Sequence, residues 1–194
     1  MLNQLRPALV LTVLLSAVTG LAYPLTVTAI AQTAFPAQAN GSRVERDGQV
    51  IGSELIGQAF SQPAYFWPRP SATGPEPYNA ASSGGANLGP TDMRLIARVA
   101  ADVQNSGGGA VPADAVTTSA SGLDPHISPA NAAAQIARVA AARGAEPDAV
   151  TAIVSAVTEA PAMGIFGEPR VNVLRLNLAL DAALPSKEQN GSPD

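Results

Sequence analysis

Residues 8–34 read ALVLTVLLSAVTGLAYPLTVTAIAQTA, and this stretch decides the architecture of the chain. It lies within a longer segment, Pro7 to Ser42, that contains no Asp, Glu, Lys, Arg or His. As a helix, residues 8–34 would extend about 40 Å at about 1.5 Å per residue. That length exceeds the hydrocarbon thickness of a bilayer, which is about 30 Å. The stretch therefore predicts a membrane-spanning helix.

A cleaved secretory signal is the alternative interpretation of the same stretch. Such signals combine a basic start, a hydrophobic run of about 7–15 residues and a small-x-small cleavage site. Ala37-Gln38-Ala39 resembles that site, but the apolar run is too long and its basic flank is the single residue Arg6. The length favours a retained helix, in which Pro24 is the expected position of a kink.

The charges beside this helix indicate an orientation. Arg6 favours a cytoplasmic N-terminus, whereas Arg43 and Arg46 after the helix argue for the reverse. Because a downstream domain of about 150 residues crosses a membrane largely regardless of its charges, the later arginines weigh less. We therefore expect a cytoplasmic N-terminus and an extracytoplasmic domain.

The composition excludes several classes of site. With 15 acidic and 11 basic residues the net charge is −4, and no basic stripe points to nucleic acid. The absence of cysteine excludes disulfides, thiolate metal sites and a cysteine nucleophile. The only lysine is Lys187, so the chain has no phosphate-binding P-loop, and it also lacks the Asp-Lys-Thr-Gly signature of a phosphorylated pump. No spacing of His and carboxylates predicts a metal site.

After the helix, the pattern predicts a single α+β domain with a small sheet and several helices. We expect residues 1–36 to form the membrane segment, 37–185 the domain and 186–194 a flexible tail. The predicted elements are a hairpin over Arg43–Ile51, a short helix capped by Ser53, a helix from Thr91 to about Gln104 with Leu95, Ile96, Val99 and Val103 buried, a helix from Ser128-Pro129 to about Arg143, a helix from Pro147 with Val150, Ile153, Val154 and Val157 on one face, and a strand over Val171–Leu180 that can pass into a helix.

Two polar, irregular segments, Thr73–Pro90 and Thr117–Ser128, are the candidate binding loops. Ser82-Ser83-Gly84-Gly85 has the composition of an anion-cradling loop, although an ordinary turn is favoured. Gln135 shares a helix face with Asn131 and Arg138, which suits a polar ligand but is more typical of a solvated face.

A second group of residues has the composition of a serine hydrolase site. Ser119, Ser121, Asp124, His126 and Ser128 lie close together in the sequence and include the residue types of a catalytic triad. Short polar side chains favour caps and turns, however, so we expect Asp124 and Ser128 to cap turns and His126 to fill a loop contact.

Taken in order, these segments resemble one family, the C subunit (KdpC) of the Kdp potassium-transporting P-type ATPase. The match covers nearly the whole chain, and its most specific block is Ser121-Gly122-Leu123-Asp124-Pro125-His126-Ile127-Ser128-Pro129. The other blocks are Leu5-Arg6-Pro7-Ala8, Thr19-Gly20, Tyr23-Pro24-Leu25, Gln38-Ala39-Asn40-Gly41-Ser42, Gly52-Ser53-Glu54-Leu55-Ile56-Gly57-Gln58, Tyr65-Phe66, Arg69-Pro70-Ser71-Ala72, Tyr78-Asn79, Ser83-Gly84-Gly85-Ala86-Asn87-Leu88 and Val171-Asn172-Val173-Leu174-Arg175-Leu176-Asn177-Leu178-Ala179-Leu180-Asp181.

The resemblance implies a role in a complex. A C subunit of this family is a non-catalytic, single-pass protein of the bacterial inner membrane. It joins a channel-like A subunit, a catalytic ATPase B subunit and a small F subunit. That complex uses ATP, Mg and K. The resemblance also implies a role in assembly and a raised ATP affinity of the complex, and the family is described as binding ATP. We assign no residue of this chain to a nucleotide.

From the resemblance and the two loops, we expect the domain to dock over the outer mouth of the channel-like subunit. The candidate interface residues are Arg69, Ser71, Tyr78, Asn79, Gly84, Gly85, Asn87, Asp124, His126 and Gln135. Two other hypotheses remain open at this point: a free-standing membrane-anchored binding module, and a secreted serine hydrolase that uses His126.

Overall fold

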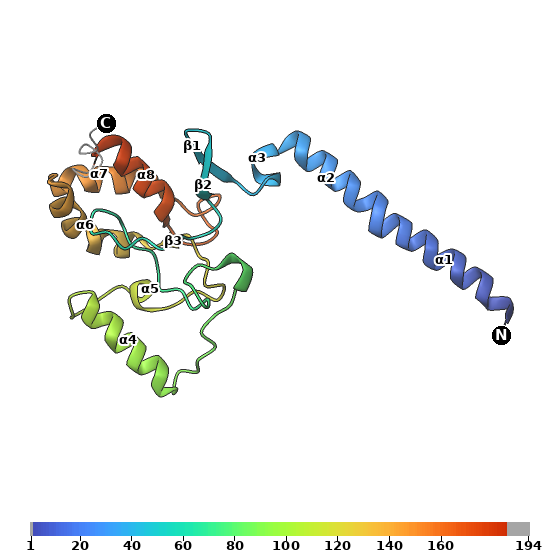
Figure 1. The fold of residues 1–194 in the computed structure, drawn as a ribbon, viewed down its shortest axis with the longest axis horizontal. Coiled ribbons are helices and arrows are strands. Elements are labelled where there is room, and N and C mark those ends of the chain that lie inside the picture. Colours follow the sequence, from blue (N-terminus) through green and yellow to red (C-terminus); the bar gives the residue numbers. More distant parts are fainter. Residues whose placement is uncertain (1, 186–194) are drawn as a thin grey trace. The chain divides into compact units, whose positions relative to one another are not determined.

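The computed structural model of the chain describes residues 2–185 and divides into two compact units, residues 1–51 and 52–194. The expected tail at 186–194, including Lys187, lies outside the described residues. The first unit contains η1 (Leu2–Gln4), α1 (Leu5–Ala17), the π-helical turn η2 (Val18–Ala22), α2 (Tyr23–Ala34), α3 (Pro36–Ala39), β1 (Arg43–Arg46) and the start of β2 (Gln49–Ser53) (Figure 1).

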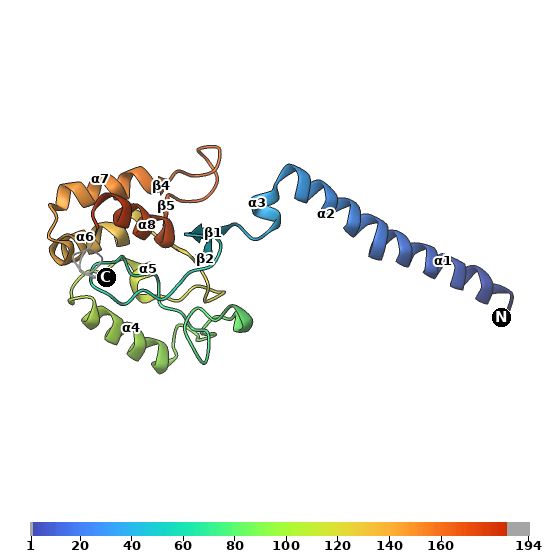
Figure 2. The ribbon, with the colours of Figure 1, turned by 45° about the horizontal axis from the view of Figure 1, so that its top comes forward.

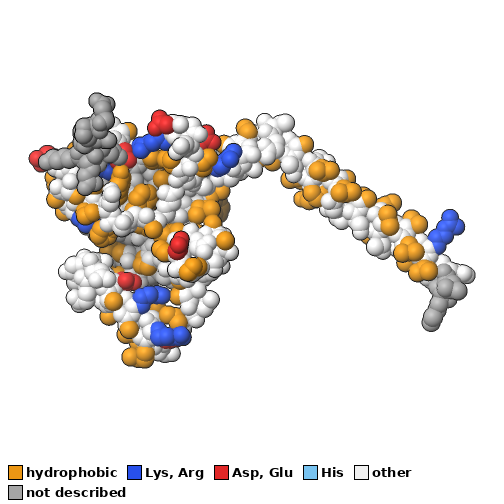
Figure 3. All heavy atoms as spheres, in the orientation of Figure 1, with side chains coloured by type: hydrophobic (Ala, Val, Ile, Leu, Met, Phe, Trp, Pro, Cys, Tyr) orange, Lys and Arg blue, Asp and Glu red, His pale blue; other side chains and the backbone are white. Residues whose placement is uncertain are grey.

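The segments α1, η2 and α2 form one continuous helix, Leu5–Ala34. Within residues 2–185 it is the one helix long and apolar enough to cross a membrane. Hydrophobic side chains cover most of its length (Figure 3). The hydroxyls of Thr19, Thr26 and Thr33 donate to carbonyls four residues earlier, so these polar groups are satisfied without water.

A π-helical turn, rather than a simple kink, accommodates Pro24. A proline has no N–H to donate to the carbonyl four residues earlier. Immediately before it, the N–H of Tyr23 bonds to the carbonyl of Val18, five residues back, which widens the helix by one residue. The sequence therefore predicted where the helix departs from regular geometry, but not that it does so through a π-helical turn.

The hairpin between β1 and β2 confirms the prediction for Arg43–Ile51. Asp47 and Gly48 have φ angles of +53° and +76°, and two successive positive φ angles are what a two-residue hairpin turn requires.

Over residues 52–185, the second unit contains a three-stranded antiparallel sheet and five α-helices. The sheet order is β3-β5-β4, with His126 opposite Asn172 and Thr158 opposite Val171. Figures 1 and 2 show α6, α7 and α8 gathered beside this sheet, with α4 on the other side of α5. The elements are η3 (Ala80–Ser82), α4 (Met93–Asn105), α5 (Ala113–Val116), β3 (His126–Ile127), α6 (Pro129–Arg143), α7 (Pro147–Val157), β4 (Thr158–Glu159), β5 (Arg170–Asn172) and α8 (Val173–Ala183).

The helix ends of this unit follow local chemistry. The Ser128 hydroxyl accepts from the N–H of Asn131 and Pro129 opens α6, while Gly144 ends it with φ +65°, all as predicted. Asn172 caps α8 directly after β5, which confirms a strand passing into a helix.

The hydrophobic core lies where α6, α7, α8 and the sheet meet. Val150 and Val154 of α7 are buried, as the helical spacing predicted. The remaining members of the core come from every neighbouring element: Phe66, Ile127, Ala132, Val139, Ala140, Val171, Val173, Leu176 and Leu180.

Two predicted features of the second unit are wrong. Ser53 does not cap a helix: its hydroxyl accepts from the N–H of Leu55 in a turn, and residues 57–61 have no regular structure. The helix expected from Thr91 to about Gln104 is present as α4, but Asp92 caps it instead of Thr91, and α4 buries none of its residues, so the predicted stripe is no part of the core. Ile96 is about half exposed.

Residues Pro63–Trp67 begin in a turn and continue without regular structure, and side chains of α6 and α8 hold them in place of a neighbouring strand. We call these residues the clamped segment. The amide of Asn177 accepts from the N–H of Phe66 (2.8 Å) and donates to its carbonyl (3.1 Å). The amide of Gln135 does the same for Trp67, at 2.8 and 3.0 Å. Each amide thus copies the hydrogen bonding of a β-ladder.

Two arginines complete the clamp. Arg143 is fully buried and donates to the carbonyl of Ala64 (2.7 Å) and to Asp181 (3.0 Å). Arg138 donates to the carbonyls of Pro63 and Tyr65 and stacks over the Trp67 ring, 3.7 Å from its centroid. The face that carries Asn131, Gln135 and Arg138 is therefore packed against this segment, and its expected solvation is wrong.

Removing the Asn177 amide tests the clamp. In Asn177→Ala, the buried N–H and carbonyl of Phe66 lose their partners, and each such loss costs about 1–3 kcal/mol. We expect the free energy of unfolding of the full chain in detergent to fall by about 2–4 kcal/mol, measured in urea by the fluorescence of Trp67, the only tryptophan. The control, Asn105→Ala at the exposed end of α4, should change it by less than about 0.5 kcal/mol. Equal effects of the two substitutions would contradict the clamp.

Candidate functional site

A cleft of about 730 Å³ holds three of the candidate residues. Arg69 follows the clamped segment, and Asp124 and His126 lie at the start of β3. The cleft is an open hollow with walls from β3, the start of α6, α5 and the segment before β5, and its lining also includes Asp114, Ile127, Ser128, Glu168, Pro169 and Arg170.

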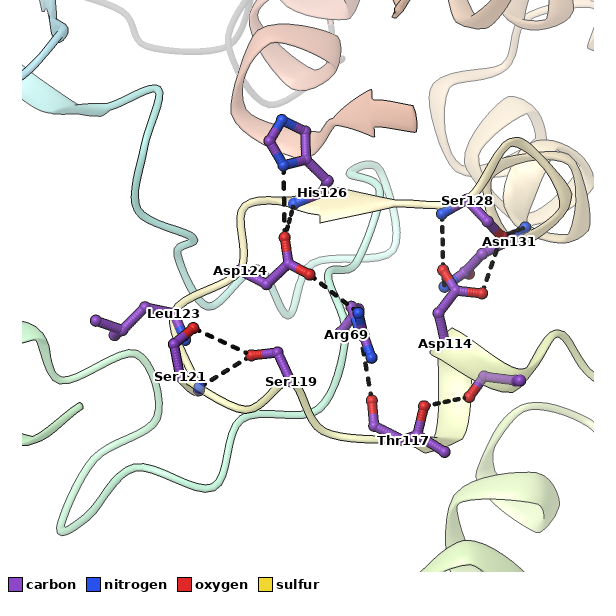
Figure 4. A network of polar contacts seen from close by, with 12 residues as sticks. Arg69, Asp114, Thr117, Ser119, Ser121, Leu123, Asp124, His126, Ser128 and Asn131 are labelled. Atoms are coloured by element: carbon purple, nitrogen blue, oxygen red, sulfur yellow. Dashed lines mark hydrogen bonds and ion pairs between the residues drawn. The ribbon is translucent and has the colours of Figure 1, made fainter. Parts of the chain in front are cut away.

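Asp124 is the centre of the polar network drawn in Figure 4. One carboxylate oxygen accepts from the Arg69 guanidinium at 3.0 Å, and the other accepts from the backbone N–H of His126 at 3.0 Å. The His126 Nδ1 lies 3.4 Å from that second oxygen. Arg69 also donates from Nε to the carbonyl of Thr117 (3.5 Å), so this cluster ties three loop segments together.

The charge of Asp124 is favoured in the folded domain. Burial by itself would raise the pKa of this carboxyl. The hydrogen bonds from the side chain and N–H of His126, with the positive charge of Arg69, outweigh burial and lower the pKa below its ordinary value. Asp124 therefore stays ionised and keeps its partners in place at neutral pH.

Ser71 and Tyr78 close the loop that precedes the cleft. The Ser71 hydroxyl donates to the carbonyl of Gly122 (2.7 Å) and accepts from the N–H of Tyr78 (3.0 Å). The Tyr78 hydroxyl donates to the carbonyl of Arg69. Burial, with the nearby charge of Asp124, raises the pKa of Tyr78 well above its ordinary range, so the phenol stays a hydrogen-bond donor.

The Gly-rich part of the loop packs closely on the segment 119–122. The N–H of Gly84 donates to the carbonyl of Ser121 (2.9 Å). A Cβ on Gly85 would lie 3.0 Å from the carbonyl of Ala120, and one on Gly122, which has φ +68°, would meet Thr73 at 2.6 Å. Gly85 and Gly122 thus allow the Gly-rich loop and the segment 119–122 to approach each other closely. Because the N–H of Gly84 donates to Ser121, it is not directed at an anion.

The other candidates lie in different places. The Asn79 side chain accepts from the N–H of Ala81 and starts η3. Asn87 is exposed with φ +50°, beside a second hollow that also includes Arg98 of α4. Gln135 belongs to the clamp and not to the cleft. The structure therefore brings together Arg69, Ser71, Tyr78, Gly84, Gly85, Asp124 and His126, and separates Gln135 from them.

Asp114 was missed by sequence reasoning. Its carboxylate accepts from the N–H (2.7 Å) and hydroxyl (2.9 Å) of Ser128 and from the amide of Asn131 (3.0 Å), at the start of α6. Fourteen residues separate Asp114 from Ser128, and no local pattern joins them. The predicted cap at Ser128 pointed to the start of α6, but it gave no indication of Asp114.

The geometry does not assemble a catalytic triad. The serine hydroxyls of 119, 121 and 128 bond within their own turns or to Asp114, and within residues 2–185 no hydrogen bond joins His126 to a serine. In Figure 4 the imidazole points away from all three. Asp124 and Ser128 cap turns, which confirms the simpler interpretation. Across the same residues, no group of three metal-ligating side chains could hold an ion.

Comparison with known proteins finds one family that matches nearly the whole length of the chain. Residues 5–182 match the family described as "KdpC: K+-transporting ATPase, c chain". The chain is 57% identical to the potassium-transporting ATPase KdpC subunit of Variovorax paradoxus (strain S110), over 95% of this chain and 99% of the relative. Identity is also 57% to the subunits of the same name from Polaromonas naphthalenivorans (strain CJ2), which covers 95% and 97%, and Gemmatimonas aurantiaca, which covers 94% of each.

Acid should remove the contribution of Asp124 to stability. Because its folded pKa is lowered, that contribution is complete above the unfolded value, about 3.9, and is lost as the pH falls through the folded pKa. We expect Asp124→Asn to lower the urea midpoint of unfolding at pH 6 and to lower it less at pH 3. The control, Asn105→Ala, changes a residue without an ionisable group at an exposed position of α4 and should show no such dependence. A difference between Asp124→Asn and the unaltered chain that stays constant with pH would contradict the network.

Proposed function

The chain belongs to the KdpC family, the c chains of K+-transporting ATPases, and we propose that it docks its domain on the extracytoplasmic face of that complex. Its family makes it a subunit of a potassium-transporting ATPase. In this proposal the chain has no catalytic role of its own, and the complex needs it for assembly and for activity. The observation that carries the proposal is the set of loops around Asp124, which hydrogen bonds and an ion pair within the domain hold in one arrangement.

The apolar helix supports the membrane placement. Leu5–Ala34 would act as the single anchor in the bacterial inner membrane, in contact with lipid and with other subunits. Arg6 at its start favours a cytoplasmic N-terminus, and the domain that follows would then be extracytoplasmic.

The proposed docking face is made of polar groups on a preformed scaffold. Its members are the loop residues Arg69, Ser71, Tyr78, Asn79, Gly84, Gly85 and Asn87 with Asp124 and His126. A preformed surface loses little conformational entropy on binding, so more of its contact energy appears as affinity. We propose that this face covers the outer mouth of the channel-like A subunit, while the B and F subunits complete the complex.

An effect on ATP affinity would be indirect in this arrangement. A domain outside the membrane cannot touch cytoplasmic ATP, so any such effect is a coupling free energy passed through the complex. We propose that docking shifts the conformational equilibrium of the catalytic B subunit. ATP, Mg and K are then used by the complex, and no nucleotide site is assigned to this chain.

Co-purification tests the proposal directly. With a tag on this chain and co-expression of the A, B and F subunits, we expect a potassium-stimulated ATPase to be recovered and to be lost when the chain is omitted. Recovery of the chain alone, together with an active pump that forms without it, would instead support a free-standing anchored binding module.

Three substitutions test the docking face. Asn87→Gly removes an exposed amide without cost to its positive φ, while Arg69→Ala and Asp124→Ala break the central ion pair. We expect each to reduce co-purified ATPase and potassium uptake by about fivefold or more, the effect of losing an interface contact worth above about 1 kcal/mol.

The matched control for these substitutions is Asn105→Ala, outside the proposed face, which should leave assembly unchanged. Urea unfolding of each variant separates a loss of fold from a loss of docking, and Asn87→Gly should unfold like the unaltered chain. Normal assembly and uptake in all three variants would refute the assignment of this face.

A further inference from the structure

The connection between β4 and β5 exposes three large hydrophobic side chains. Its residues 160–167 read APAMGIFG and carry no charge. The side chains of Met163, Ile165 and Phe166 are 90%, 79% and 66% exposed. We call residues 161–167 the apolar loop. Side chains of this size gathered at one exposed position in a soluble domain usually mark a binding site.

The apolar loop is ordered by its own backbone. Ala162 and Phe166 exchange two N–H to carbonyl hydrogen bonds, both 2.9 Å long, and the N–H of Gly164 donates to the carbonyl of Pro161 at 2.9 Å. Met163 and Gly164 have positive φ angles that complete the tight turn. At its base, the ion pair between Glu159 and Arg170 (2.9 Å) joins the two strands. Contacts within the domain therefore hold the loop in a shape that exposes its hydrophobic side chains.

The apolar loop is continuous with the proposed docking face. It leads directly into Glu168, Pro169 and Arg170, and these three residues form one wall of the cleft that contains Arg69, Asp124 and His126. A partner that covers the cleft would meet the apolar loop at its border. The polar cluster and the hydrophobic side chains thus form one surface of mixed character, as protein interfaces do.

A protein partner fits this loop better than a lipid surface. Segments that insert into membrane interfaces usually carry Lys or Arg around their apolar residues. Here the base of the loop contains Glu159, Glu168 and Arg170, with no excess of positive charge. Three side chains also fall well short of the roughly 800 Å² per partner of a stable interface, so they suit an anchor within the larger contact.

We propose that Met163, Ile165 and Phe166 insert into an apolar recess on the extracytoplasmic surface of the channel-like subunit and anchor the domain there. This inference rests on the proposed docking function and adds the hydrophobic part of its interface. Hydrophobic side chains that fill a partner's pocket commonly carry a large share of binding energy, while the polar contacts around them give register and specificity.

A single fluorescent label tests the inference in the assembled complex. Because the chain has no cysteine, Ile165→Cys can be labelled at one position with an environment-sensitive probe. The labelled full chain is placed in nanodiscs alone and together with the A, B and F subunits, with and without spin-labelled lipid. The control label is Ala152→Cys, at an exposed position of α7.

We expect the probe at position 165 to shift to the blue only in the complex, without quenching by spin-labelled lipid. Lipid quenching would show membrane insertion and overturn the inference, and so would an unshifted probe in a complex that has assembled. If the chain does not co-purify with the other subunits, the docking function itself fails and this inference falls with it, a result that is distinct from an unshifted probe.

A pair of variants tests the energetic role. Ile165→Ser/Phe166→Ser alters only exposed side chains and leaves the backbone bonds of the loop, so urea unfolding of the full chain should not change. Recovery of the ATPase through the tag should fall about tenfold. Met93→Ser, an equally exposed hydrophobic change on α4, should leave recovery unchanged. Full recovery with the double variant, or an equal loss with Met93→Ser, would overturn the anchoring role.

Discussion

The clamped segment, Pro63–Trp67, is hydrogen-bonded by side chains of α6 and α8, and the arrangement of the domain depends on those bonds. Phe66 is fully buried in the core, so its N–H and carbonyl need partners that no strand supplies. Asn177 supplies both, and the buried Arg143 joins the same segment to Asp181. The helices α6 and α8 are thereby joined to each other through the clamped segment, rather than by apolar contact alone.

This clamp also sets where the docking face lies. Arg69 follows Trp67 by two residues, so fixing the clamped segment places the guanidinium opposite Asp124. The Ser71 hydroxyl then bonds both to the carbonyl of Gly122 and to the N–H of Tyr78. Asp124 in turn accepts a hydrogen bond from the N–H of His126 in β3. Loops of this length are often mobile, but here their backbone groups are bonded to one another. The face is consequently a shaped surface that a partner can bind without first ordering it.

Local signals in the sequence predicted much of the fold. The apolar run, Asp47-Gly48, Ser128-Pro129 and Gly144 each act through the backbone of their own neighbourhood, and the structure has the helix, turn and caps that they indicate. The predictions that were wrong concern residues whose contacts lie far away in the sequence. The face with Gln135 looked solvated because its partner, Trp67, lies 68 residues earlier. Gly57, within the helix expected after Ser53, instead packs so closely that a Cβ there would clash with the ring of Tyr78, which lies 21 residues later in the sequence. The apolar loop has no periodicity, so only its exposure in the folded domain distinguishes it.

Hydrogen exchange of the full chain, free in nanodiscs and in the assembled complex, measures most directly whether this preformed face is what docks. The prediction is that backbone amides of residues 84–88, 119–126 and 161–170 exchange more slowly after assembly. The amides of Phe66 and Trp67 should already be protected in the free chain, and those on the exposed side of α7 should not change. Slowing confined to α7, or a clamped segment that becomes protected only on assembly, would contradict a preformed docking face.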